Sequence, residues 1–143
     1  MKKLLTLLLL TVTAACFYRG NRQSPIMAAT RATEFAQAAF VEQNKDKAFN
    51  LLHPEFQAYT TREKFAQILT AMNTPIAPSS INATDFEPIP GQEAMSIYIT
   101  GESDRETFYY RIPMKGNVRD GYKPVGIFRN QGPYPKTPSR IAL

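Results

Sequence analysis

The feature that most constrains the fold of this chain is a change of character at residues 73–80, which read NTPIAPSS. Two prolines in this stretch end helical structure, because proline lacks a backbone donor and disfavours the α conformation of the residue before it. Before the break, apolar residues recur at helical spacing; after it, they alternate or form short runs between turn residues. Helices followed by an antiparallel meander predict an α+β fold with the helices on one face of the sheet.

Three helices are predicted before the break, over residues 26–43, 45–52 and 61–72. Ser24 and Pro25 mark the start of the first, as an N-cap followed by a proline that loses no hydrogen bond at this position. The first helix carries one apolar stripe at positions i, i+3, i+4, i+7 and i+8, made of Ala32, Phe35, Ala36, Ala39 and Phe40.

The second and third predicted helices are bounded by residues that commonly end or begin helices. His53 precedes Pro54, which predicts that the second helix ends there with the imidazole complementing the negative end of the helix dipole. Residues 56–59 then read as an irregular link. Thr60 and Glu63 have the spacing of a capping box, which predicts that Thr60 caps the third helix.

Four strands are predicted after the break, over residues 81–89, 94–100, 105–112 and 122–129. Glycine-containing turns at 101–104 and 115–121 separate the later strands. Pro124 cannot donate to a strand ladder, so it is expected at an edge or a bulge. The last stretch, 131–143, is a proline-rich tail expected to pack only partly. The predicted fold is α+β, with three N-terminal helices packed on a curved antiparallel sheet of about four strands.

The first sixteen residues, MKKLLTLLLLTVTAAC, have the layout of a secretory signal peptide, with two lysines, an apolar run and then small residues. The apolar run of ~10 residues is half of the ~20 that a membrane-spanning helix needs. Residues 13–16 resemble the lipobox of bacterial lipoproteins, although Thr13 stands where that family prefers leucine. The resemblance implies that the thiol of Cys16, the only cysteine, is acylated and the chain cut before it. An ordinary signal peptide cut after Ala15 is the alternative.

This interpretation divides the chain into a signal peptide (1–15), lipidated Cys16 with its tether (16–25), the α+β domain (26–130) and the tail (131–143). In the lipoprotein family, aspartate after the cysteine often marks retention in the inner membrane. Phe17 follows Cys16 here, which favours the periplasmic side of the outer membrane of a Gram-negative bacterium. The partner expected from this segment is the membrane itself, through the N-terminal lipid.

The number and distribution of the charged residues exclude one kind of partner. Loss of the leader removes two of the 17 basic residues and none of the 12 acidic ones, which leaves a small positive excess. The basic residues are spread singly and form no cluster of the kind that nucleic acids require, so no nucleic-acid partner is expected.

The domain resembles small secreted or lipid-anchored members of the nuclear-transport-factor-2-like (cystatin-like) superfamily. The resemblance rests on the helix with Phe35, Ala36 and Phe40, on KAFNLLHPEF at 47–56, on the threonine-capped helix at 61–72 and on GYKPVGIF at 121–128. It implies a curved sheet wrapped around a long helix, which makes a cone with an apolar pocket. Some members of the superfamily are isomerases or dehydratases, and many only bind or scaffold.

No catalytic set stands out in the chain. There is one histidine, His53, and its place before Pro54 suits a helix end better than a general base, which needs an orienting partner. One histidine and one cysteine leave no zinc ligand set, and no cofactor or metal is expected. No catalytic residue is predicted.

The aromatic residues give the better candidates for a site. Phe108 and Tyr110 share one face of a predicted strand, and Tyr109 and Arg111 share the other. One face is expected to be core. The other is a candidate pocket or partner surface, on which Arg111 would hold an anionic group. The candidate residues for this pocket or surface are His53, Tyr59, Tyr98, Tyr109, Arg111 and Tyr122.

Three functions remain open at this point. The favoured hypothesis is a lipid-anchored periplasmic domain that binds or scaffolds a partner protein or an envelope component without catalysis. The first alternative is a small-molecule-binding or isomerase/dehydratase-type pocket protein. The second alternative is an accessory or immunity lipoprotein that binds one dedicated protein.

Overall fold

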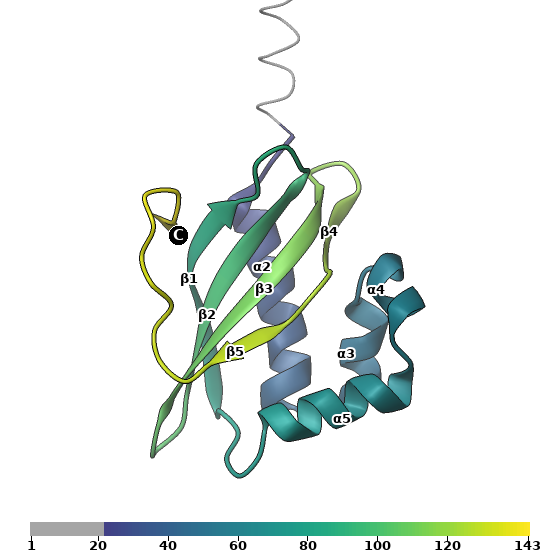
Figure 1. Cartoon of the computed structure of the whole chain (residues 1–143), viewed down its shortest axis with the longest axis vertical. Helices are drawn as coiled ribbons and strands as arrows, with labels where there is room; N and C mark the ends of the chain where they lie inside the picture. The colour runs from purple at the N-terminus through teal and green to yellow at the C-terminus, as the bar shows by residue number, and fades with distance from the viewer. Residues whose placement is uncertain (1–21) are drawn as a thin grey trace, which may run out of the picture.

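The computed structural model describes residues 22–143 and confirms the predicted α+β fold. The signal peptide, the lipidation at Cys16 and most of the tether lie outside the described residues. The helices come first and the strands follow, with a break between Met72 and Ser80. Figure 1 shows the sheet with the long helix α2 crossing one of its faces and α3–α5 lying beyond one side and one end.

The first helical segment consists of the α-helix α2 (Pro25–Ala36) and the π-helical turn η1 (Gln37–Val41). As predicted, Ser24 caps α2, since its hydroxyl accepts from the Met27 N–H at 3.2 Å. The wider π turn within this segment was not predicted. Gln43, at φ 53°, lies just beyond the segment, and Asn44 caps the next helix by accepting from the Lys47 N–H.

Three shorter helices follow, α3 (Lys45–Leu51), α4 (Pro54–Tyr59) and α5 (Arg62–Met72). The predicted irregular link at 56–59 is wrong, because these residues lie in α4. Two capping assignments are also wrong. His53 caps the start of α4 rather than the end of α3, since its extended backbone lets Pro54 take the first helical position. Thr61, rather than Thr60, caps α5 by accepting from the Lys64 N–H at 3.2 Å.

The sheet has six antiparallel strands, whose bounds are β1 (Ser80–Pro88), β2 (Ala94–Glu102), β3 (Thr107–Asn117), β4 (Gly121–Pro124), β5 (Phe128–Asn130) and β6 (Ile141–Ala142). Their order is β4-β3-β2-β1-β6, and β5 also pairs with β3. The single last strand predicted at 122–129 is wrong, because it is two short strands separated by residues 125–127. Pro124 ends β4 at the edge of the sheet, which agrees with its missing donor.

The turn predicted at 115–121 is shorter in the structure, because β3 continues to Asn117. The close approach of β4 requires glycine at position 116. Its φ is 136°, and a Cβ there would lie 1.8 Å from the carbonyl oxygen of Gly121. The hairpin from β3 to β4 therefore turns over only residues 118–120.

The core lies between α2–η1, α5 and one face of the sheet. The Phe40 ring stacks on the Tyr110 ring with centroids 4.0 Å apart, and both side chains are fully buried. Side chains of β3 that face the helices alternate with half-buried ones that face away. The largest fully buried side chains are Tyr110, Phe35, Phe40, Phe65, Phe108, Leu52, Leu69, Met95, Ile97, Ile99, Ile112 and Met114. These side chains fill the helix-covered side of the sheet.

Candidate functional site on the outer face of the sheet

The six candidate residues do not form one site. Tyr98, Tyr109 and Arg111 share the face of the sheet that points away from the helices, and Tyr98 lies directly opposite Arg111 in the pairing of β2 with β3. We call this side the outer face. The other three candidates, His53, Tyr59 and Tyr122, lie elsewhere.

Each of these three has a different setting. Tyr122 is buried, and its hydroxyl accepts from the Ser24 N–H at 2.8 Å and donates to Gln23, so it joins β4 to the start of α2. His53 holds α4 through its Nδ1 atom, which accepts from the Glu55 N–H at 3.2 Å. Tyr59 is 87% exposed on α4. The hydrogen bonds of Tyr122 and His53 account for their positions in the fold, and Tyr59 belongs to α4 rather than to the strands of the outer face.

Arg111 is the central residue of the outer face. Its guanidinium carbon lies 4.7 Å from the centre of the Phe128 ring and 6.0 Å from that of Tyr134. Its Nε is buried and has no hydrogen-bond partner, and no carboxylate forms an ion pair with it among residues 22–143. The positive charge of Arg111 helps to lower the pKa of Glu87, but among residues 22–143 no carboxylate lies close enough to form an ion pair with this half-buried cation.

Glu87 is an acidic residue whose carboxylate feels the charge of Arg111, but its oxygens already accept hydrogen bonds from other side chains. Thr137 and Ser139 donate to one oxygen, and the Tyr98 hydroxyl donates to the other at 2.6 Å. These three hydrogen bonds lower the pKa of Glu87 to about 2. Burial and the adjacent carboxylate raise the pKa of Tyr98 to about 12. A pair with these values neither accepts nor releases a proton readily near neutral pH, so it is a poor acid–base pair.

A buried ion pair lies beside this network. Arg140 and Asp85 are 2.8 Å apart, and their side chains are 10% and 14% exposed. Burial alone would raise the pKa of Asp85, but hydrogen bonds from Thr84 and Arg140 outweigh it and lower that pKa. The Arg140 guanidinium also lies 3.9 Å from the centre of the Tyr98 ring.

The C-terminal segment supplies much of this site. After β5 it runs around the β1 side of the sheet (Figure 1), and β6 pairs with β1 at Asp85 and Phe86. It brings Tyr134 against Tyr98, with ring centroids 5.5 Å apart. Sequence reasoning set residues 131–143 aside as a tail and so missed Tyr134, Thr137, Ser139 and Arg140 as neighbours of the candidate residues. Their contacts with this site span 23 to 55 positions, and no local pattern marks them.

A second concave region lies on the helix side, between α5, the start of β3 and β5. It is an open cleft of about 550 Å³ that includes Met72, Glu106 and Arg129. Unlike Arg111, Arg129 has partners: it donates to the Met72 carbonyl, lies 3.8 Å from Glu106 and covers the Phe108 ring. The cation in this cleft is therefore already engaged by the protein.

Within residues 22–143 no three His, Cys, Asp or Glu side chains gather as metal ligands would. In the same range no helix has the length and apolarity to cross a bilayer. Comparisons of the chain with protein-family models, with curated proteins and with solved structures gave no match.

Proposed function

We propose that this chain is a lipid-anchored periplasmic protein that binds a partner, either a protein or an envelope component, through the outer face of its sheet and without catalysis. The observation that carries the proposal is Arg111, a half-buried cation between Phe128 and Tyr134 that no carboxylate of the described chain pairs with. The anchor rests on the lipobox-like residues 13–16.

Arg111 indicates the chemistry of the partner. Removing a guanidinium from water without an anion is unfavourable, whereas a carboxylate or phosphate can take two of its N–H donors at once. Stacking on aromatic rings leaves the edge of the guanidinium to such an anion. An acidic group on the partner is therefore the expected counterpart of Arg111.

The surroundings of Arg111 suit a binding surface. Phe128 is 45% exposed, and Tyr109 and Tyr134 are half-buried beside it. Aromatic residues and arginine dominate the binding energy of protein interfaces, because they combine large apolar area with specific polar contacts. The packed helix side of the sheet and the low pKa of Glu87 give less support to a pocket enzyme of the isomerase or dehydratase kind.

Site-specific photo-cross-linking in the native host tests this function. A photoreactive phenylalanine replaces Tyr109 on the outer face or, as the matched control, Tyr59 on α4. We expect a discrete adduct from position 109 and none from position 59. Arg111→Ala should remove the adduct, because a central arginine contributes about 2 kcal/mol or more to an interface. Arg111→Lys should restore it in part, since lysine keeps the charge without the planar fork.

The result that contradicts the binding face is an adduct from position 59 alone, or one that survives Arg111→Ala unchanged in a protein of normal stability. A single dedicated protein in the adduct would identify the accessory or immunity type of lipoprotein.

The anchor is tested separately by mass spectrometry of the mature N-terminus. Acylated Cys16 at the first position is the expected result. An unmodified Cys16, or cleavage at another site, overturns the anchor and leaves the binding face to be judged by cross-linking.

A further inference from the structure

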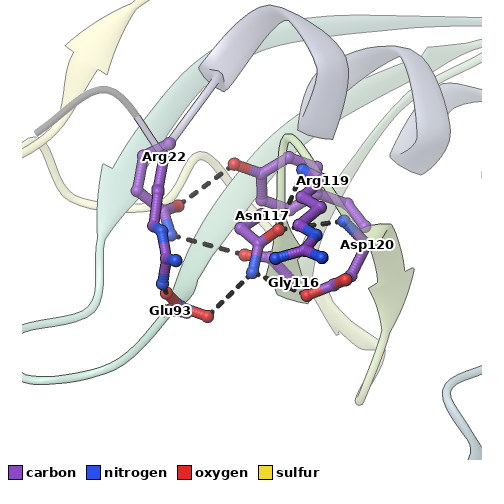
Figure 2. Close-up of polar contacts among 8 residues, drawn as sticks. Arg22, Glu93, Gly116, Asn117, Arg119 and Asp120 are labelled. Atoms are coloured by element: carbon purple, nitrogen blue, oxygen red, sulfur yellow. Dashed lines mark hydrogen bonds and ion pairs between the residues drawn. The ribbon is translucent and has the colours of Figure 1, made fainter. Parts of the chain in front are cut away.

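The described chain begins against the hairpin that joins β3 and β4. The Val118 N–H donates to the Arg22 carbonyl at 2.9 Å, and the Gln23 side chain donates to the Gly116 carbonyl at 3.3 Å. Arg22 also pairs with Glu93 at 3.5 Å. Figure 2 shows Arg22 beside Glu93, next to Gly116 and Asn117 at the turn. The place from which the N-terminal segment leaves the domain is therefore fixed.

Asn117 makes this hairpin rigid. Its Oδ1 accepts from the backbone N–H groups of Arg119 and Asp120, both at 2.9 Å, and its Nδ2 donates to Glu93 and Asp120, also at 2.9 Å (Figure 2). Asn117 is 5% exposed, so these bonds are shielded from water. The two acidic groups at this end thus face Asn117, while the tip of the hairpin projects outward.

The tip consists of Val118 and Arg119. Val118 is 43% exposed, and Arg119 is exposed with no side-chain partner among residues 22–143. An apolar side chain next to a free cation is the combination that suits the boundary between lipid headgroups and acyl chains. The guanidinium can donate to a lipid phosphate while the valine meets the apolar layer below it.

The length of the tether places the tip near a membrane. Cys16 lies six residues before Arg22, and six fully extended residues span at most about 20 Å. A lipid on Cys16 therefore keeps the β3–β4 end within that distance of the bilayer. In Figure 1 this end lies at the top of the described domain, and the turn between β2 and β3 lies near its bottom.

We propose that the tip formed by Val118 and Arg119 docks on the surface of an anionic bilayer and sets the orientation of the anchored domain. The proposal rests on the lipid anchor of the proposed function. Docking at this end directs the sheet along the membrane normal, because the strands run from this hairpin toward the opposite end of the domain (Figure 1). The outer face with Arg111 then faces sideways into the periplasm, where a partner can reach it.

Single-cysteine labelling of the full lipoprotein tests the docking. Lipidation occupies Cys16, the only cysteine of the chain, so a cysteine introduced by Val118→Cys or, as the control, Asp104→Cys in the β2–β3 turn is labelled uniquely. The purified protein is placed in nanodiscs that contain phosphatidylglycerol and a headgroup nitroxide, and quenching of an environment-sensitive fluorophore is measured. We expect strong quenching at position 118 and none at position 104. Arg119→Ala should weaken the docking equilibrium about fivefold, and neutral lipid should have a similar effect.

Equal quenching at the two positions, or none at position 118 in a protein whose mass shows acylated Cys16, overturns the docking while the anchor stands. A mass without acyl chains overturns both. Quenching at position 118 that is indifferent to Arg119→Ala and to anionic lipid overturns the headgroup contact, because proximity would then come from the tether alone.

Discussion

The two faces of β3 carry side chains of similar size but different chemistry. Toward the helices, Phe108, Tyr110, Ile112 and Met114 are at most 1% exposed and form a continuous apolar core. On the outer face, Tyr109, Arg111 and Pro113 are half-buried. The Arg140–Asp85 ion pair and the carboxylate of Glu87 also lie on this side of the sheet. Packing stabilises the first face, whereas hydrogen bonds and ion pairs hold the C-terminal segment near the second.

Two tyrosines make the contrast specific. The Tyr110 hydroxyl is buried without a hydrogen-bond partner in the described chain, and burial raises its pKa to about 12. The Tyr98 hydroxyl, on the outer face, donates to Glu87 at 2.6 Å. On the helix side the Tyr110 ring packs in the core although its hydroxyl has no partner. On the outer face the Tyr98 hydroxyl itself makes a hydrogen bond.

Phe40→Ala should have the largest effect on stability. The ring is fully buried and stacks on Tyr110, so its removal should lower the free energy of unfolding by about 4 kcal/mol. Urea denaturation measures this, and Tyr59→Ala, which alters an 87% exposed ring, should stay within about 0.5 kcal/mol of the wild type. A small effect for Phe40→Ala would mean that the helix side is loosely packed.

Arg140→Ala should rank second. It leaves the carboxylate of Asp85 largely buried and unpaired, which should cost about 3 kcal/mol. The matched control is Lys47→Ala, which breaks an exposed pair with Glu42 at 2.9 Å and should cost about 0.5 kcal/mol or less. Similar costs in the two variants would show that the C-terminal segment adds little to the outer face.

Replacing each tyrosine with phenylalanine should change the stability in opposite directions. Tyr98→Phe removes a hydrogen bond to a carboxylate and should destabilise by about 2 kcal/mol. Tyr110→Phe removes an unpartnered buried hydroxyl and should be neutral or stabilising by about 1 kcal/mol. Thermal and urea unfolding of both variants give the comparison, and equal losses would contradict the assignment of the Tyr110 hydroxyl as unpaired.

Lowering the pH should reduce the free energy of unfolding through protonation of Glu87 on the outer face, by less than the losses expected for Arg140→Ala and Tyr98→Phe. The pKa of Glu87 in the folded protein is about 2, below its ordinary value of 4.5, so the stability it adds is present above pH 4.5 and is lost as the pH falls toward 2. Because the group is partly solvated, the loss should be about 1 kcal/mol. Glu87→Gln should flatten this part of the pH dependence of unfolding, and an unchanged slope would assign it to other carboxyl groups.

The fold was predictable where its signals are local. The stripe from Ala32 to Phe40 and the cap at Ser24 depend on neighbours a few positions away, and the structure confirms them. Residues 94–100 lie in a strand as predicted, but nearly all of its side chains are buried on both faces. The errors lie at junctions. Thr60 and Thr61 are equally good caps in sequence, and residues 54–59 are too short to show a helical period.

The candidate site was predictable only in part. Tyr98, Tyr109 and Arg111 belong to one face because alternation in a strand follows from geometry. That Tyr122 is tied to Gln23 and Ser24 depends on contacts about 100 positions apart. Nothing near Tyr122 in the sequence distinguishes it from the tyrosines of the outer face.

The sequence by itself determined that the helices precede the strands, and it determined the alternation that separates Tyr110 from Arg111, because both follow from short-range backbone geometry and apolar periodicity. Only the tertiary structure decided that residues 131–143 return to β1, that Arg140 pairs with Asp85, and that Arg111 lies over two rings without an ion-pair partner among residues 22–143. These facts depend on which distant segments meet, and that is set by burial of the whole core rather than by any local pattern.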